Sequence, residues 1–386
     1  TAPDNVKIIA IDQQSLTFLE ENGLSWPWYR SIYGTVLSVL KTAGARGVAI
    51  DILFTEGRID RPDDDQEFFE AVRQSVPSVF AAVLSDKPGQ FGGTWVRTDK
   101  LFIESSLISK SQVRSMQDVL LPLDGLVESA TALGDVSTVR DTDSMFRWYH
   151  PYSRLQNGFV PGLPLALYHA VHPNKDPSAR VKHYLHKGAV GIKYYGPEHT
   201  FETIPFAAVF DAFVTLQQGG TPRLDVSMFK DAYVFIGFTA PGLFDNVAVP
   251  VADTYPGVEV NATVFANLLE NSFVKPVGFL VDALLTLFWL ITVTSSAFQY
   301  TSLLRQGVWI SVGFFAFLAL HTSLAVLGYW SMMIVPFVAT LLSLLTALAF
   351  QYNTEGRKRR FIRNAFSHYL NAKVIDNLVA DPGSLQ

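Results

Sequence analysis

Three long apolar stretches near the end of the chain dominate its hydrophobic pattern. They run over residues 276–298, 307–328 and 330–352. The charged side chains in this segment are Asp282 and Arg305. At a rise of about 1.5 Å per residue, each stretch is long enough to cross a hydrocarbon core of about 30 Å as a helix. The pattern predicts three transmembrane helices, with residues 1–275 on one side of the membrane and residues 353–386 on the other.

Basic residues in the short flanks predict the orientation, because Lys and Arg are retained on the cytoplasmic side. Arg305 and five basic residues after the third stretch would share one face, and only Lys275 flanks the other. The five are Arg357, Lys358, Arg359, Arg360 and Arg363. We therefore expect a multi-pass protein of the inner (plasma) membrane, with residues 1–275 extracytoplasmic and the tail cytoplasmic.

Charge and cysteine content narrow the class of the outer domain. The whole chain has a net charge of −5 at pH 7. The tail from Asn353 has six basic and three acidic residues and the membrane segment one of each, so residues 1–275 carry a net charge of −5 − 3 = −8. This acidic balance excludes nucleic acid as the expected partner. Without cysteine the domain must be held together by its core. The start at Thr1 and the helix stop at Asp381-Pro382-Gly383 lead us to expect an upstream anchor and a further downstream module.

Alternating strand and helix patterns predict the fold of residues 1–275. Residues 6–11 (VKIIAI) and 47–52 (GVAIDI) are β-branched runs with a helical pattern between them, which makes a βαβ unit. Further expected elements are helices at 64–74, 163–171 and 258–271, strands at 79–83, 189–195 and 233–237, and a hairpin of 134–139 with 144–149. Because the strands are continuously apolar, we predict one α/β domain with a mixed, mainly parallel sheet covered on both faces.

Polar residues at the expected carboxyl ends of the strands form the candidate ligand site, because helix N termini point free N–H groups there. The set is Asp12, Asp51, Thr239 and Asp245, with Trp26, Trp28 and Arg30 above them. An unknown extracytoplasmic ligand or protein would bind there. The alternative, which these residue types favour, is that the Asp side chains cap helices and that the Trp-Pro-Trp turn packs without binding anything.

Other candidate chemistry is weaker. His169 with His172, and His183 with His186, have the i, i+3 spacing of metal ligands, but neither pair has a Cys or Glu-x-x-His partner, and surface histidines are the favoured interpretation. The sequence has no phosphate loop, no Gly-x-Ser-x-Gly and no Gly-x-Gly-x-x-Gly. We therefore assign no catalytic residue, metal site or cofactor to this chain.

The cytoplasmic tail shows an apolar stripe at helical spacing. Its members are Phe361, Ile362, Ala365, Phe366, Tyr369 and Leu370, and they continue the third apolar stretch as an amphipathic stalk. Asn371 can cap a second short helix that ends at Asp381. An apolar face on a single helix must be buried against a partner, and a second copy of the stalk in a parallel homodimer is the simplest one. A helix lying on the lipid surface is the alternative.

Two segments of the outer domain resemble a known family. The opening, with IIAIDQQSL, WPWYR and AGARGVAIDILF, and the closing unit, with FKDAYVFIGFTAPGLFDN and YPGVEVNATVFANLLENSF, resemble the CHASE type 2 extracellular sensor domains. The resemblance covers most of residues 4–352 and is loose over about 87–187. It implies a sensor domain followed by three membrane helices.

The tail resembles a second known segment. RRFIRNAFSHYLNAKVIDNLVADPG is similar to the cyclase transducer that precedes the catalytic domain of bacterial class III adenylate cyclases, although Asn371-Ala372 stands where that family commonly has Ser-Pro. This resemblance implies a receptor that makes cyclic AMP from ATP, with Mg²⁺ or Mn²⁺ held by two Asp residues of a dimeric catalytic domain. Those residues are not in this sequence, so the chain itself is expected to be catalytically silent.

Two alternatives to the cyclase remain open. A CHASE-type sensor histidine kinase would need a phosphoacceptor, and His368 lies on the stalk, but no acidic neighbour follows it as in the usual motif. A non-catalytic, membrane-anchored binding module is the third possibility. The signal that is sensed and the choice between ATP and GTP are not readable from these residues.

Overall fold

The computed structural model describes residues 1–57, 61–92, 98–104, 108, 113–137, 139–242, 246–299, 303–331, 333–342, 345–346 and 349. The chain divides into two compact units, Thr1–Lys275 and Pro276–Gln386. We call the first the sensor unit and the second the helical unit.

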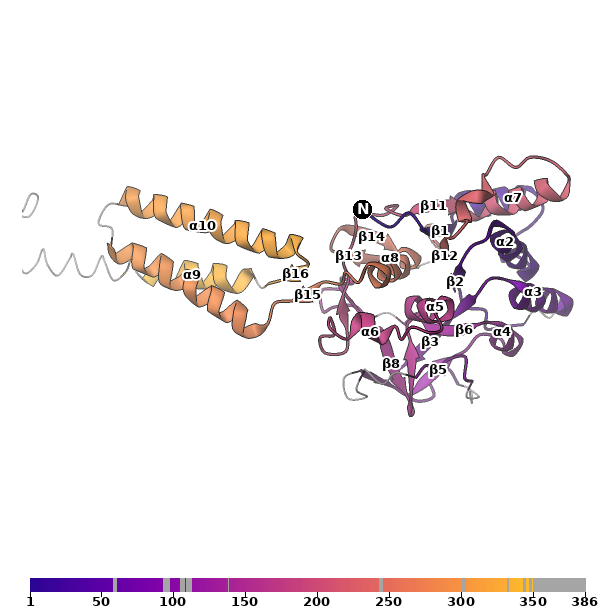
Figure 1. The fold of residues 1–386 in the computed structure, drawn as a ribbon, viewed down its shortest axis with the longest axis horizontal. Helices are drawn as coiled ribbons and strands as arrows, with labels where there is room; N and C mark the ends of the chain where they lie inside the picture. Colours follow the sequence, from indigo (N-terminus) through magenta and orange to yellow (C-terminus); the bar gives the residue numbers. More distant parts are fainter. Residues whose placement is uncertain are drawn as a thin grey trace, which may run out of the picture. The chain divides into compact units, whose positions relative to one another are not determined.

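A seven-stranded sheet forms the centre of the sensor unit (Figure 1). Its strands, in spatial order, are β11 (Glu202–Pro205), β1 (Val6–Ile11), β12 (Tyr233–Phe238), β2 (Gly47–Asp51), β3 (Ser78–Ser85) and β5 (Asp118–Leu120), with β6 (Ala132–Asp135) also paired to β3. All pairs are parallel except β3 with β5. The predicted mixed, mainly parallel sheet is confirmed.

Helices cover both faces of the sheet (Figure 1). One face packs against α2 (Arg30–Ala43), α3 (Pro62–Gln74) and α7 (Phe206–Gln217), with α1 (Gln13–Glu21) and α4 (Asp124–Ser129) beside them. The other face packs against α5 (Leu163–Val171) and α8 (Gly257–Glu270). Alternate residues of one strand serve the two cores: Ile9 belongs to the first and Ile8 to the second. This explains why the strands are apolar throughout.

Smaller elements complete the sensor unit. They are β4 (Arg114–Met116), β8 (Tyr152–Leu155) and β9 (Gly158–Pro161) in one sheet, the pairs β7 (Trp148–Tyr149) with β10 (Val190–Gly191) and β13 (Asn246–Val249) with β14 (Ala252–Pro256), helix α6 (Ser178–Val181), the 3-10 turn η2 (Val226–Phe229) and the terminal β15 (Lys275–Pro276).

The predicted hairpin of 134–139 with 144–149 is wrong. Residues 132–135 form β6, which pairs in parallel with β3, and Trp148 and Tyr149 form β7, which pairs with β10. Gly134 explains why this segment joins the sheet and does not form a hairpin: a Cβ at this position would lie 2.4 Å from the Leu163 Cα. The strand therefore lies against the start of α5, which a hairpin excursion away from the sheet would not allow.

The helical unit consists of apolar helices with exposed apolar side chains. They are α9 (Phe279–Gln299) and α10 (Leu303–Val326), followed by the short strand β16 (Tyr329–Trp330) and helical residues 334–342. The Trp289 indole donates to Thr340 Oγ1 at 2.6 Å and stacks on Phe317 at 5.1 Å between ring centroids. Gly313 allows this approach, since a Cβ there would lie 2.8 Å from the Trp289 ring.

Helix length and composition in the described residues mark Val308–Val326 as able to cross a membrane. The apolar part of α9, Phe279–Ser295, falls short of that length. Three crossings were predicted, and this criterion supports one. The stalk residues Phe361, Ile362, Ala365, Phe366, Tyr369 and Leu370 lie outside the described residues.

Candidate functional site

The carboxyl edge of the sheet brings together three of the residues expected there. β12 lies between β1 and β2, with Ile11 opposite Phe238 and Gly237 opposite Asp51. Asp12 and Thr239 follow the first of these pairs directly, so Asp12, Asp51 and Thr239 belong to three neighbouring strand ends. Asp245 lies outside the described residues.

Asp12 and Thr239 have partners close to them in the chain or on the neighbouring strand. The Asp12 carboxylate accepts a hydrogen bond from the Ser15 N–H at 2.7 Å, and this caps the N terminus of α1. The N–H groups of Thr239 and Ala240 both donate to the Ile11 carbonyl at 3.1 Å. At the ends of β1 and β12 the contacts are therefore a helix cap and backbone hydrogen bonds, as the capping alternative expects.

Of the three residues expected above the edge, two are buried. Trp28 is 3 % exposed and stacks on Phe206 at 5.1 Å between ring centroids. Arg30 is also buried and pairs with an acidic residue of α3. Trp26 differs: it is 39 % exposed and packs edge-on against Trp28 at 5.0 Å and Phe238 at 5.7 Å. Trp26 is therefore the member of the set that can meet a ligand.

Trp26→Ala is expected to lower the free energy of unfolding of the sensor unit by about 1 kcal/mol, because the ring loses edge contacts rather than core burial. Thermal unfolding of the detergent-solubilised chain measures this. A loss above about 3 kcal/mol, which is typical of a core aromatic, would contradict the assignment of Trp26 to the accessible surface.

Arg30 connects α2 to α3 through two acidic residues. Its guanidinium pairs with the Asp65 carboxylate and donates to the Glu56 carbonyl, and both Asp65 and Arg30 are buried. Asp64 accepts from the backbone N–H of Arg30 at 2.6 Å and of Ser31 at 3.0 Å. These are the first N–H groups of α2, so Asp64 on a neighbouring helix supplies the N-cap that Tyr29 does not. We call this set the α2–α3 brace.

Asp51 has a different environment. Its side chain points to the face covered by α8, where Asn261 Nδ2 donates to Asp51 Oδ2 at 2.8 Å. Burial raises the pKa of Asp51 from 3.8 to about 6, and the hydrogen bond from Asn261 acts in the opposite direction. Gly237 beside it has no side chain, which leaves room for Val258 of α8. Asp51 therefore joins the sheet edge to α8.

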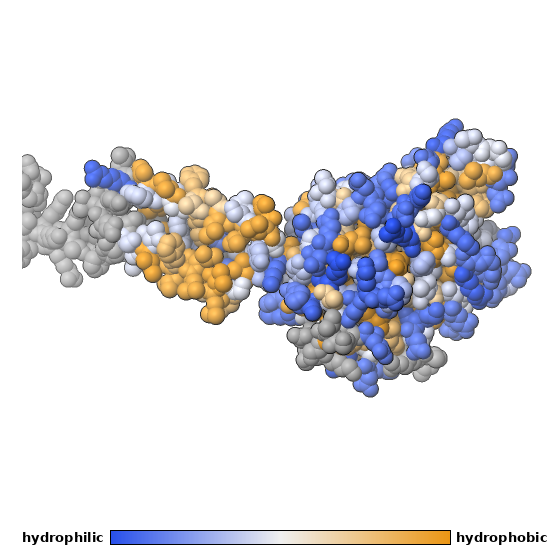
Figure 2. Space-filling view, viewed as in Figure 1, coloured by the Kyte–Doolittle hydropathy of each residue, from blue (hydrophilic) through white to orange (hydrophobic). Residues whose placement is uncertain are grey.

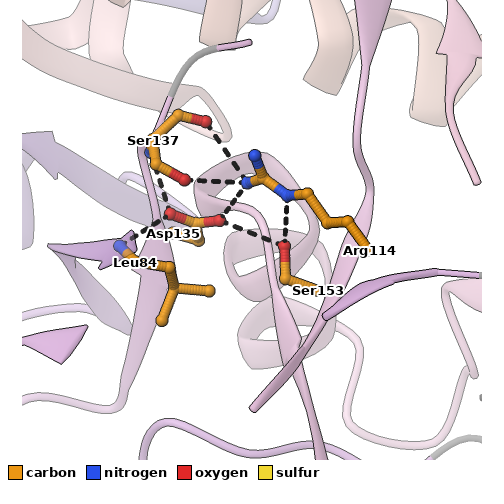
Figure 3. Close-up of polar contacts among 5 residues, drawn as sticks. All are labelled: Leu84, Arg114, Asp135, Ser137 and Ser153. Atoms are coloured by element: carbon orange, nitrogen blue, oxygen red, sulfur yellow. Dashed lines mark hydrogen bonds and ion pairs between the residues drawn. The ribbon is translucent and has the colours of Figure 1, made fainter. Parts of the chain in front are cut away.

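A second polar cluster lies at the same edge and was not predicted from the sequence (Figure 3). Asp135 ends β6 and is 4 % exposed. Its carboxylate accepts from Arg114 Nη2 at 2.6 Å and from the Ser137 N–H at 2.8 Å, and Arg114 also donates to Ser153 Oγ at 2.7 Å. Burial, and then the charge of Arg114, lower the pKa of His150 to about 4, so His150 is neutral at pH 7.

Tyr149 lies between the two clusters. Its hydroxyl is buried, and a Cβ on Gly162 at the start of α5 would collide with it. Burial raises the pKa of the Tyr149 hydroxyl well above 10, and the charges of Asp135 and Asp51 add to this. The signal that could have revealed this edge is the Asp that ends each of two buried strands, β2 and β6.

Three polar side chains attach α8 to different parts of the sensor unit. Every residue from Gly257 to Leu268 is buried, so each polar side chain here needs a partner. Glu259 accepts from the N–H groups of His199 and Thr200, both at 3.0 Å. Asn267 clamps Lys193 by accepting from its N–H at 2.9 Å and donating to its carbonyl at 3.0 Å. With Asn261, these contacts hold the last helix before the helical unit.

The histidine pairs do not form a metal centre in the described part of the chain, where no group of three His, Cys, Asp or Glu side chains is placed to share an ion. His172 packs on Tyr168 at 4.7 Å between ring centroids and its ring contacts the Tyr168 carbonyl at 3.2 Å. His186 lies beside Trp148 at 6.0 Å. These contacts give both residues a packing role.

Comparison with known proteins gave one finding. A family model described as "CHASE2 domain" matches residues 1–297, which is the whole sensor unit and most of α9. No curated protein and no solved structure matches the chain.

Proposed function

The chain belongs to the CHASE2 family, an extracellular sensor domain of signalling proteins, and from this premise we propose that it is the sensor and transmembrane part of a receptor-type adenylate cyclase. In this proposal the sensor unit receives an extracytoplasmic signal, and the helical unit and the tail transmit it. The output is the synthesis of cyclic AMP from ATP.

The observation that carries the membrane part of the proposal is the surface of the helical unit. Figure 2 shows it as predominantly hydrophobic, whereas polar side chains cover much of the visible sensor unit. Phe279 is 82 % exposed, Phe288 72 % and Ile334 78 %. In water, this apolar surface would stay exposed at a cost in free energy. The hydrocarbon core of a bilayer covers it and removes that cost. We therefore propose that all three apolar stretches cross the membrane, with the basic tail in the cytoplasm.

The cyclase output rests on the tail. The resemblance of residues 359–383 to the cyclase transducer is the feature that favours this output over a histidine kinase or a non-catalytic module. The active site of that cyclase class forms between two subunits, and this fits the apolar stripe on the stalk as the interface of a homodimer. Mg²⁺ or Mn²⁺ would be bound with ATP by the catalytic domain, and we assign neither to residues 1–386.

Transmission from the sensor unit requires that a signal bind one arrangement of the domain better than another. The carboxyl edge of the sheet is the proposed receiving site, because Trp26 is accessible there and Asp51 joins the edge to α8. α8 ends at Glu270, five residues before the boundary of the sensor unit, so a change in its position is passed directly to the chain that enters the membrane.

The test uses the full-length protein in membranes with ATP and Mn²⁺. Cyclic AMP is the expected product, and Phe366→Asp, which places a charge on the apolar stripe, is expected to reduce both its yield and crosslinked dimer by at least tenfold. Lys373→Asp, which leaves that stripe intact, is the matched control. Phosphate transfer to His368 without cyclic AMP synthesis would favour the histidine kinase over the cyclase. Unchanged crosslinking of Phe366→Asp would favour a stalk that lies on the lipid surface over a dimer interface.

A further inference from the structure

The chain leaves the sensor unit at the edge of the sheet where the strands begin, opposite the proposed receiving site. Near the carboxyl end of β12, Gly237 lies beside Val258 at the start of α8. Further along α8, Phe265 packs on Tyr233, the first residue of β12, at 4.9 Å between ring centroids. α8 therefore runs back along the sheet, and the unit ends shortly after it, at Lys275. We call this side of the unit the amino edge.

A basic segment reaches the amino edge from α5. The last turn of α5 packs over Gly47, the first residue of β2, where a Cβ would lie 2.5 Å from a side-chain carbon of Val171. Residues 172–193, which follow, hold five basic residues and one acidic residue, a net charge of +4. The whole sensor unit carries −8, so its other residues carry −12. Positive charge is therefore concentrated in a segment that begins at the amino edge.

Hydrogen bonds attach this segment to the exit of the chain. The Val274 N–H donates to the Gly191 carbonyl at 2.8 Å. The Tyr184 hydroxyl donates to the Asn271 carbonyl at 2.6 Å. α9 begins at Phe279, five residues after Val274, and five residues span at most about 17 Å. The covalent chain therefore keeps the segment within about 17 Å of the first apolar helix.

Six basic side chains lie on this segment or beside it, and all are exposed except the half-buried Arg180. We call them the basic edge: Arg46, Lys175, Arg180, Lys182, Lys187 and Lys193. Burial lowers the pKa of His172, and the positive charges of Lys175, Arg46 and Arg180 add to this. Three of the six cations therefore surround one imidazole ring.

Acidic neighbours offset only part of this charge. Asp231 pairs with Arg46 at 3.1 Å. Asp176 follows Lys175 and accepts from the Ser178 N–H at 2.8 Å. Glu270 accepts from the Tyr195 hydroxyl at 2.7 Å. These three carboxylates balance half of the six basic charges, and the surface keeps an excess of positive charge.

We propose that the basic edge docks on anionic phospholipid headgroups of the membrane that α9 enters. This inference rests on the proposed membrane crossing and adds a second contact with the same bilayer. Lys and Arg near an anionic leaflet are attracted by its negative surface potential. Trp148 and Tyr184, both half-buried, lie beside the exit strand, and these residue types favour the level of the headgroups.

The net negative charge of the sensor unit does not prevent this docking, because the two edges of the sheet are far apart. β1 has six residues and spans about 20 Å between the amino and carboxyl edges. This is more than twice the Debye length of about 8 Å at physiological ionic strength. Asp12 and Asp51 at the carboxyl edge are therefore screened from a membrane that the basic edge touches. Docking in this way turns the receiving site, with Trp26, toward the extracytoplasmic space.

Lysine footprinting of the chain in nanodiscs tests the proposal, with an uncharged, water-soluble amine reagent and mass spectrometry. The comparison is between discs of phosphatidylcholine alone and discs that also contain phosphatidylglycerol. Lys187 and Lys193 are expected to react about fivefold more slowly in the anionic discs, which corresponds to about 1 kcal/mol per lysine. High salt should restore their rates. Lys87, which is exposed beyond the carboxyl end of β3, should react equally in both discs.

Charge reversal identifies the residues that make the contact. In the Lys182→Glu, Lys187→Glu double variant, the slowing at Lys193 is expected to fall below about twofold. The Lys87→Glu, Lys100→Glu variant makes the same change in charge at exposed lysines outside the basic edge, and it should keep the slowing at Lys193.

Equal lysine rates in neutral and anionic discs, or a slowing that survives the charge reversal, would overturn the docking while the chain remains in the bilayer. A chain that does not stay with the lipid discs would instead refute the membrane crossing, and the docking with it. The readout involves no nucleotide, so it is independent of whether the output is a cyclase.

Discussion

Arg30→Met is expected to lower the free energy of unfolding of the sensor unit by about 3–5 kcal/mol, because it removes the buried guanidinium that pairs with the buried Asp65 carboxylate. The methionine keeps much of the side-chain volume, so the loss reports the charge and not a cavity. Urea unfolding of the solubilised chain, followed by near-UV circular dichroism of its tryptophans, measures it.

Two further variants separate the brace from other effects. Arg46→Met removes an exposed ion pair with Asp231, whose side chains are 53 % and 62 % exposed, and should cost less than about 1 kcal/mol. Combining Arg30→Met with Asp65→Leu removes both charges and should recover a large part of the loss. Equal costs for Arg30 and Arg46 would show that the α2–α3 brace has no special importance.

This brace also shows what the sequence could not predict. Arg30 was a candidate for ligand contact because it follows the Trp-Pro-Trp turn, and its partners Asp64 and Asp65 are more than 30 residues away in the chain. Local patterns do not reveal that α3 presents two acidic side chains to the start of α2. A buried Arg with a long-range partner looks the same in sequence as an exposed one.

The central strands were predictable because their patterns are local. Residues 6–11 match β1, and the runs at 47–52 and 233–237 match β2 and β12 to within one residue. β11 was missed because it has only four residues, begins with Glu202 and ends with Pro205, two residue types that are rare in strands. Among the described residues it joins the sheet through its pairing with β1. The edge position tolerates both residues, since one side of β11 has no strand to pair with among the described residues.

The candidate site was predicted in position more than in composition. The topology does place Asp12, Asp51 and Thr239 at one edge, as the strand ends suggested. However, Arg114, Asp135 and Ser153 come from three separate strands, β4, β6 and β8, and their meeting depends on pairings that no local period encodes. The role of Asn261 was equally hidden, because it stands 210 residues from Asp51.

Asp51→Asn is expected to stabilise the sensor unit at pH 7.5 relative to pH 4, by an amount that reaches roughly 3 kcal/mol. Burial raises the pKa of Asp51 from 3.8 to about 6, and each tenfold weakening of its acidity costs the folded, ionised protein about 1.36 kcal/mol. The stability that the protonated Asp51 provides is fully present below about pH 4 and is lost as the pH rises through about 6. Asparagine does not ionise, so the variant escapes this loss.

The measurement is the difference in melting temperature between the Asp51→Asn chain and the unsubstituted chain, taken at pH 4.5 and at pH 7.5. The difference removes the contributions of every other titrating group, provided that these are equal in the two chains. The change in stability over this range is about 2 kcal/mol, so the difference should grow by about 4–8 °C in favour of the variant, and Asp253→Asn should show no such growth. A difference that is the same at both pH values would mean that Asp51 keeps its ordinary pKa in the folded protein.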